Sequence, residues 1–315
     1  QFGLVGSEMC IRDSSLTSVN LSALNPNLSI SKELFLKSIP ISLASGVSQI
    51  NLVVGRQISS LFDGAMVWLI YADRLAQLPI ALIGVALNVV TLPKLSSLKK
   101  SGRKVEGNSY LNRSMQLSLI FALPASVGLI YLSFEIISSL FQRGNFLVND
   151  AIQTSKALSI YGLSIIPISL QMLLLNFYFA EKNIRIPFYY SLASVFLNVS
   201  LAYTLLDTFK FLAPPIAYAI TNWLVFISLV YHTYKFGFYF NSAFKQALPR
   251  IVISSCFMLT LLILTKSVTL QYFSTQILTI LWLSMVIPLS GISYFACLKF
   301  LGILDKNFWV NDFSK

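Results

Sequence analysis

Eight long apolar segments follow one another along this chain and leave little sequence between them. A helix needs about 20 mainly apolar residues to cross the hydrocarbon core of a bilayer. Segments of that length occupy residues 38–62, 65–93, 110–134, 155–180, 188–209, 213–234, 248–267 and 276–302. Only 11% of the 315 residues are charged, and the mean hydropathy is +0.72. The sequence therefore predicts an all-α polytopic bundle of about eight transmembrane helices.

The basic residues are distributed unevenly between the two ends of these segments. If the residues before position 38 lie in the cytoplasm, alternation leaves only Arg143, Lys156, Lys210 and Lys266 in connections on the opposite side. Most other lysines and arginines then face the cytoplasm, as the positive-inside rule requires, and the C-terminus does too. This bias accounts for the net charge of +11 without a nucleic-acid partner. We expect the basic loop 94–113 to lie against anionic lipid headgroups.

An Asp-Arg pair, Asp73-Arg74, stands inside the apolar segment 65–93. Each such charge costs roughly 2.5–3.5 kcal/mol on insertion scales, so ionisable residues in a span usually face a cavity or the bundle interior. At 3.6 residues per turn, one face of this helix is polar or small. That face carries Arg74, Gln77, Ala81, Gly84, Asn88 and Thr91. We interpret it as a cavity wall, with a helix–helix contact as the alternative, and expect Asp73 to orient Arg74 or to pair with another helix.

The first segment carries a similar polar face. Its members are Ser45, Gln49, Arg56 and Ser59. Arg56 lies near the segment end, so it either faces the cavity or snorkels outward to the interface. Two inward arginines on neighbouring spans would suit phosphate or pyrophosphate, which guanidinium groups bind in bidentate geometry.

Other candidate sites have little support. The cysteines Cys10, Cys256 and Cys297 and the single His232 show no metal-ligand spacing, so we predict neither a metal site nor a cofactor. Asn198 is interpreted as an interhelical hydrogen-bonding residue, and Glu135 as a residue that meets headgroups or water at a span end. Residues 5–14, VGSEMCIRDS, resemble a translated sequencing adapter. We therefore predict residues 1–30 to be artefactual or disordered, ahead of a fragment that lacks upstream spans.

Three segments together resemble the MurJ/MviN-type lipid II flippases of the multidrug/oligosaccharidyl-lipid/polysaccharide exporter superfamily. They are SQINLVVGRQISSLFDGAMVWLIYADRLAQLPIALIGVALNVVTLPKLS (48–96), LFQRGNF (140–146) and FYFAEKNIRIP (177–187). The resemblance implies the C-terminal eight spans of a fourteen-span fold, in the bacterial cytoplasmic membrane. Within it, residues 31–235 would form a six-span half and 236–305 two extra spans lining a lipid-tail groove, followed by a cytoplasmic tail, 306–315.

The resemblance also implies a transporter, not an enzyme. Such proteins move an undecaprenyl-pyrophosphate-linked peptidoglycan precursor to the outer leaflet by alternating access, and the family's essential cavity arginine falls on Arg74, preceded by Asp73. Some members bind sodium. Of those ligands only Asn198 is retained, because Gly55 and Ala202 stand where carboxylates are expected, so ion coupling stays open. Contact with cell-wall synthesis proteins is left open too.

Three alternatives remain from the residues alone. The chain could flip another polyprenyl-linked glycan, act as a polytopic membrane transferase, or bind lipid-linked precursors without moving them. A transferase would need paired loop carboxylates or a His/Asp dyad, whereas the loop acids here are scattered singly.

Overall fold

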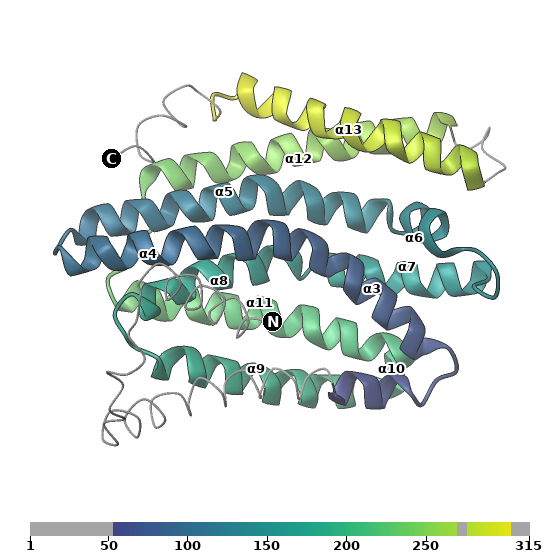
Figure 1. Cartoon of the computed structure of the whole chain (residues 1–315), viewed down its shortest axis with the longest axis horizontal. Coiled ribbons are helices and arrows are strands. Elements are labelled where there is room, and N and C mark those ends of the chain that lie inside the picture. The colour runs from purple at the N-terminus through teal and green to yellow at the C-terminus, as the bar shows by residue number, and fades with distance from the viewer. Residues whose placement is uncertain (1–52, 270–275, 304–315) are drawn as a thin grey trace, which may run out of the picture.

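The computed structural model describes residues 53–269 and 276–303, and this part of the chain is helical throughout, with no strand. Figure 1 shows long helices lying side by side. After a helical segment at residues 53–59, the elements are α3 (Ala65–Pro79), the π-helix η2 (Ile80–Val85), α4 (Ala86–Lys100), α5 (Lys104–Tyr131), α6 (Ser133–Phe141), α7 (Val148–Gly162), α8 (Ile165–Phe179), α9 (Arg185–Thr204), α10 (Leu206–Phe209), the 3₁₀-helix η3 (Lys210–Leu212), α11 (Ala213–Lys235), α12 (Ser242–Thr269) and α13 (Gln276–Phe300).

The predicted bundle of membrane helices is confirmed for the described residues. Seven helical stretches are long and apolar enough to span a bilayer. They run over Ala65–Lys100, Lys104–Tyr131, Val148–Phe179, Arg185–Thr204, Leu206–Lys235, Ser242–Val268 and Ile277–Phe300. Each corresponds mainly to one predicted span, and Leu206–Lys235 also includes the last four residues of the span predicted at 188–209. Most of the first predicted span, 38–62, lies outside the described residues.

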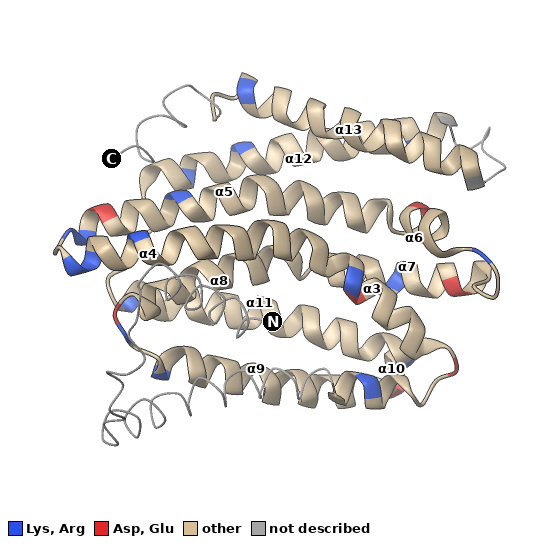
Figure 2. Ribbon diagram, viewed as in Figure 1, with Lys and Arg blue, Asp and Glu red and all other residues tan. Residues whose placement is uncertain are grey.

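The predicted basic loop 94–113 is wrong in its extent, because most of it is helical. The α4 helix continues to Lys100 and α5 begins at Lys104, so that only residues 101–103 form the turn. Gly102 adopts a left-handed φ of 77°, a conformation that glycine reaches without steric cost. Lysine and arginine favour helices, so the basic residues extend the helices past the apolar segments. Figure 2 shows basic residues gathered at this turn, which we call the basic end of the bundle.

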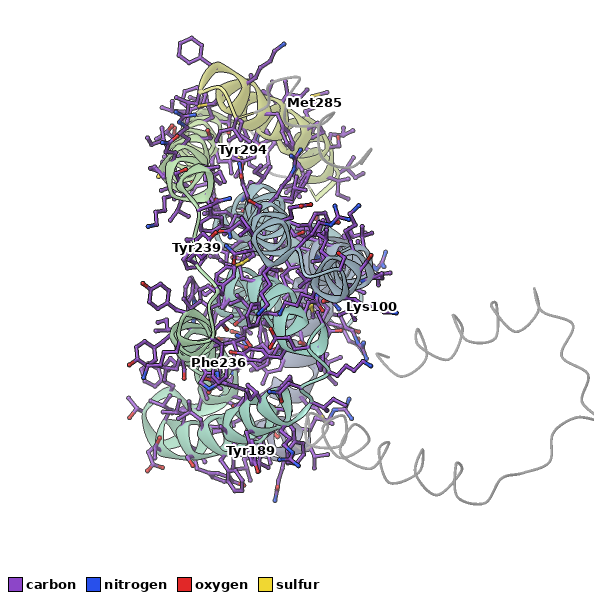
Figure 3. All side chains as sticks on the ribbon, turned by 90° about the vertical axis from the view of Figure 1, so that its left-hand side faces the viewer. Lys100, Tyr189, Phe236, Tyr239, Met285 and Tyr294 are labelled. Carbon is purple, nitrogen blue, oxygen red and sulfur yellow. The ribbon has the colours of Figure 1, made fainter. Side chains whose placement is uncertain are left out.

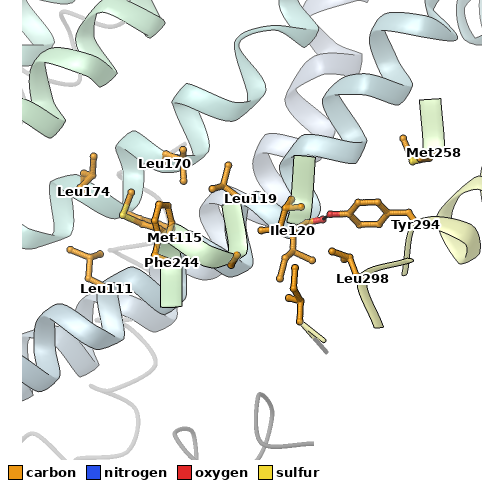
Figure 4. Packing of buried hydrophobic residues seen from close by; sticks show 14 of the residues in the cluster. Leu111, Met115, Leu119, Ile120, Leu170, Leu174, Phe244, Met258, Tyr294 and Leu298 are labelled. Atoms are coloured by element: carbon orange, nitrogen blue, oxygen red, sulfur yellow. Dashed lines mark hydrogen bonds between the residues drawn. The ribbon is translucent and has the colours of Figure 1, made fainter. Parts of the chain in front are cut away.

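The helix α5 occupies the middle of the bundle and packs on α4, α8 and α12. On one side of it α12 packs on α13, and on the other side α3 packs on α7 and α9 packs on α11. Figure 3 looks along the helices from the basic end and shows this order, from α13 with Met285 and Tyr294 to α9 with Tyr189. Around α5, buried Leu111, Met115 and Ile120 pack against residues of α8 and α12, and the Tyr294 hydroxyl donates to the Ile120 carbonyl at 2.8 Å (Figure 4).

Two neighbouring spans are broken. Pro79 ends α3, and the chain then forms the π-helix η2. Likewise α7 ends at Gly162 and α8 begins at Ile165, with Pro167 in its first turn. A proline lacks an N–H and so leaves the carbonyl four residues earlier without its helical donor.

Side chains of neighbouring helices satisfy the backbone at the second break. The Trp223 indole donates to the Leu163 carbonyl at 3.1 Å, and the Ser126 hydroxyl donates to the Gly162 carbonyl at 2.7 Å. Inside a bilayer no water is available for this purpose, so a broken helix persists only where neighbours supply such donors. Side chains of α5 and α11 therefore stabilise the break between α7 and α8.

The α12–α13 pair is attached to the bundle at both ends. Near the basic end, Asn112 donates to the Tyr239 carbonyl at 2.9 Å and accepts from the Asn241 N–H at 3.2 Å. At the far end, opposite the basic turn, Lys266 of α12 forms an ion pair of 2.6 Å with Glu135 of α6. The expectation that Glu135 meets headgroups or water is wrong. Its side chain is only 5% exposed, because Lys266 neutralises it within the protein.

We expect Lys266→Met to lower the stability of the chain by about 3 kcal/mol, because it leaves the buried Glu135 carboxylate without its cation. The double variant Glu135→Gln/Lys266→Met removes both charges and should recover most of the loss. The Tm of each purified variant in detergent measures the effect. A double variant less stable than Lys266→Met would contradict the assignment.

Candidate functional site

A cavity of about 400 Å³ lies between the segment 53–59 and helices α3, α7, α9 and α11. Its polar lining consists of Arg56, Ser59, Asp73, Arg74, Gln77, Tyr161, Ser194, Asn198, Tyr218 and Asn222. Residues from five stretches of sequence, the furthest pair more than 160 positions apart, thus meet in one place. The interpretation of α3 as a cavity wall agrees with this arrangement.

Two arginines from different segments reach this cavity. Arg56 comes from the helical segment 53–59 and Arg74 from α3, and both are exposed. Of the two possibilities for Arg56, the structure places it on the cavity. Packing of Ile58 against Ala202 and Ala217 seats the first segment on α9 and α11. A guanidinium stays charged at any accessible pH, so the lining carries two fixed positive charges.

Asp73 is the carboxylate that lines the cavity, and it pairs along its own helix. Gln77 Nε2 donates to Asp73 Oδ2 at 2.5 Å, four residues and one turn away. The expectations that Asp73 orients Arg74 or pairs with another helix stay predictions, and the hydrogen bond to Gln77 is a partner that they did not include. No ion pair within 4 Å involves Arg56 or Arg74 among the described residues. Two positive charges against one negative charge leave this wall net positive.

The polar face predicted from Arg74 to Thr91 does not continue along the whole span. Asn88 does not line the cavity, and Thr91 is buried, with its hydroxyl donating to Ser114 of α5 at 3.0 Å. The physical reason is η2, since a π-turn closes i→i+5 bonds and holds an extra residue. Each extra residue turns the following side chains by about 100° relative to an uninterrupted α-helix.

The glycine of the predicted face serves close packing. A Cβ atom on Gly84 would lie 3.0 Å from the Met172 sulfur and 3.5 Å from the Ser169 Cα, so η2 packs closely on α8 and a larger residue would require Met172 to shift. This half of the span therefore makes the helix–helix contact that was the alternative interpretation. The proposed substrate contacts of Asn88 remain a prediction without support from this geometry, and Gln49 lies outside the described residues.

The cavity also contains polar residues that sequence reasoning missed. Tyr161 of α7 and Tyr218 of α11 meet edge to face, with ring centroids 5.9 Å apart. The Asn222 side-chain amide donates to the Tyr218 backbone carbonyl at 2.8 Å, and the backbone carbonyl of Asn222 accepts from Gln171 Nε2 at 2.7 Å. The spacing of Tyr218 and Asn222, four residues apart in an apolar segment, was the one signal available. Nothing in the sequence brings Tyr161 to them.

Positions related to a possible ion site also converge here. Gly55, Asn198 and Ala202 all line the cavity, so the positions implied by the resemblance lie near one another. Asn198 was expected to bond between helices, and the structure places it on the cavity wall. Within residues 53–269 and 276–303 no group of three or more His, Cys, Asp or Glu side chains could hold a metal ion.

The chain matches the family model of the lipid II flippase MurJ over residues 22–284. It is 32% identical over 239 residues to a probable lipid II flippase MurJ of Rhizobium meliloti, covering 75% of this chain and 44% of that protein. It is 28% identical over 250 residues to the Rickettsia prowazekii protein of the same description, covering 79% and 49%. The chain spans about half the length of the curated relatives it matches.

Solved structures agree with the sequence matches. An inward closed lipid II flippase MurJ superposes with a TM-score of 0.71 at 26% identity, covering 84% of this chain and 54% of that one. A MOP superfamily transporter from Pyrococcus furiosus superposes with a TM-score of 0.55 at 14% identity, over 84% of this chain and 61% of that chain, and shows the fold alone.

The rotation caused by η2 can be tested with single cysteines in a background where Cys10, Cys256 and Cys297 are serine. We expect Gln77→Cys to react readily with a membrane-impermeant maleimide and Asn88→Cys to react at least about tenfold more slowly, because side chains beyond the π-turn leave the water-accessible face. The labelling rate in permeabilised membranes gives the measurement. Equal labelling rates at both positions would show that the polar face continues along the whole span and would contradict the rotation.

Proposed function

The chain belongs to the lipid II flippase MurJ family, and we propose that it forms the part of such a flippase that carries one cationic wall of the transport cavity. The main supporting observation is that Arg56 and Arg74 both line one cavity, while Gln77 donates a hydrogen bond to Asp73. This arrangement leaves guanidinium groups available to an anion.

The ligand that suits this wall is a pyrophosphate. Guanidinium groups bind phosphate oxygens through paired N–H donors, and such charge-assisted bonds are stronger than neutral ones. A pyrophosphate presents several anionic oxygens over a short distance, so two arginines from neighbouring segments can share it. In a polyprenyl-linked precursor, that pyrophosphate joins the saccharide to the lipid.

We infer that the complete protein transports lipid II as a flippase and performs no covalent chemistry. The headgroup would enter the cavity from the cytoplasmic leaflet, and rocking of two halves would expose it on the other side, as in alternating-access transporters. The seven apolar helices support a multi-pass location in the bacterial inner membrane. The C-terminus is proposed to face the cytoplasm, because the basic turn between α4 and α5 then lies on the cytoplasmic side.

Anionic lipids are proposed to contact this basic end. Lys100, Arg103 and Lys104 are exposed there, and Arg103 also pairs with Glu106 at 3.2 Å. The α12–α13 pair is proposed to accommodate the lipid tail, since many of its apolar side chains are exposed. Neither proposal affects the role of Arg74.

We expect Arg74→Ala, placed in a full-length flippase gene that encodes this sequence, to abolish growth of a lipid II flippase-depleted strain. Arg74→Lys should restore part of the growth, because an ammonium keeps the charge and loses the paired donors. Lys156→Ala is the matched control, since it removes a cation that does not line the cavity. Normal growth of Arg74→Ala at normal protein level would overturn the role of this arginine.

The substrate is tested separately. Transport of lipid II by the reconstituted full-length protein, reduced by Arg74→Ala, supports the proposal. Transport of another polyprenyl-linked glycan and failure with lipid II would assign the cavity to a different headgroup. Binding of lipid II without transport would make the protein a precursor-binding scaffold.

A further inference from the structure

The turn between α6 and α7 packs on α3, the helix that carries Arg74, beside its cavity face. This turn belongs to the segment LFQRGNF, residues 140–146, which the proposed function leaves without a role. The Phe141 ring lies parallel to the Tyr71 ring, with centroids 4.6 Å apart and an interplanar angle of 4°. Phe146 closes the cluster, with its centroid 5.8 Å from that of Tyr71. We call Tyr71, Phe141 and Phe146 the aromatic clamp.

A hydrogen bond holds the same helix one turn earlier. Trp68 Nε1 donates to Asp150 Oδ1 at 2.8 Å, and Asp150 Oδ2 accepts from the Leu147 N–H at 2.7 Å. The carboxylate that caps the first turn of α7 thus also holds α3. The Trp68 ring meets Phe211 edge to face at 5.2 Å. Two successive turns of α3 are therefore fixed to elements at the far end of the bundle.

These contacts lie beside the cavity face of α3 without forming part of it. Leu69, Asp73, Arg74 and Gln77 line the cavity, whereas Trp68 and Tyr71 do not. Arg74 follows Tyr71 by three residues, and side chains at that spacing are neighbours on a helix surface. The Tyr71 ring and the Arg74 side chain therefore leave α3 on adjacent parts of its surface.

The second half of this span, η2 and α4, does not position Arg74. The α-helical hydrogen bonding changes at η2, immediately after Pro79, so α3 and α4 are joined by a π-turn rather than by a continuous α-helix. Beyond it, α4 is held by different partners, because Lys99 donates to the Phe177 carbonyl at 2.9 Å and pairs with Glu181 at 2.7 Å. Contacts at the far end thus hold α3 together with its packing on α7 through Leu69, Ala72 and Ala76, and contacts at the basic end hold α4.

We propose that the aromatic clamp is a positioning device for the cavity arginine, and that Tyr71 is its central positioning residue. The clamp fixes the rotation of α3 about its own axis, so that Arg74 points into the cavity. Its importance for transport rests on the proposed anion-binding role of Arg74, whereas the positioning itself does not.

The test measures the position of residue 74 without any substrate. In a background where Cys10, Cys256 and Cys297 are serine, Arg74→Cys is labelled with a negatively charged methanethiosulfonate, and the rate is compared with and without Tyr71→Leu. We expect Tyr71→Leu to change the rate by about threefold or more, because it removes the stacked ring pair. Tyr71→Phe should leave the rate unchanged, since the stack needs the ring and not the hydroxyl.

A second cysteine position separates positioning from general loosening. Ser194→Cys reports the opposite wall of the cavity, on α9, and its rate should not respond to Tyr71→Leu. Phe141→Leu, which removes the other ring of the stack, should reproduce the change at position 74. This variant keeps the test decisive if Tyr71→Leu fails to fold.

Three results would overturn the proposal. They are an unchanged rate at position 74 in both leucine variants, equal changes at positions 74 and 194, and an effect of Tyr71→Phe as large as that of Tyr71→Leu. The labelling experiment contains no ligand. If Arg74→Ala grew normally and the proposed function therefore failed, the labelling rates would still test whether Tyr71 positions residue 74.

Discussion

Backbone groups inside a bilayer have no water to bond, and the way this bundle satisfies them determines where its cavity lies. Two neighbouring spans that run in the same direction are broken (Figure 1), one by Pro79 and η2 and one between α7 and α8. Gly84 lies beside Ser169, and Pro79 and Ser164 each precede these contact residues by five positions. The two breaks therefore stand at a similar depth. Discontinuous helices at such a depth commonly border transporter binding sites, because they separate the half-helices on either side.

The sequence predicts well which segments form membrane-spanning helices, and less well which side of each helix faces the cavity. Length and hydropathy suffice for the helices, because a lipid environment admits few alternatives to a closed α-helix. The faces depend on the angular position of each residue around its helix. The structure places Arg74 and Gln77 of the predicted polar face on the cavity, and Asn88 away from it. The π-turn follows Pro79 and packs on α8 at Gly84, and a projection at 3.6 residues per turn cannot include it.

Contacts between residues that are distant in the sequence could not be predicted either. Glu135 stands at a helix end, where water or headgroups are the ordinary expectation, and only the fold brings Lys266 to it from 131 positions away. Tyr161 and Tyr218 are single aromatic residues in apolar segments, which are ordinary core positions until α7 and α11 meet. The motif LFQRGNF marked a resemblance without a mechanism, and its contact with Tyr71 supplies a physical reason for the aromatic residues in it.

The charged residues of the cavity come from two of the five stretches that line it. Arg56, Asp73 and Arg74 come from the segment 53–59 and α3, whereas the walls from α7, α9 and α11 contribute hydroxyl and amide groups. An anion in this space is attracted towards Arg56 and Arg74, and α7, α9 and α11 offer it only neutral hydrogen-bonding groups. Because Gln77 holds Asp73, the net field depends on where the guanidinium of Arg74 points. On the proposed role of the aromatic clamp, that direction depends on contacts beside the cavity face of α3, so the electrostatics of the cavity depends on packing outside it.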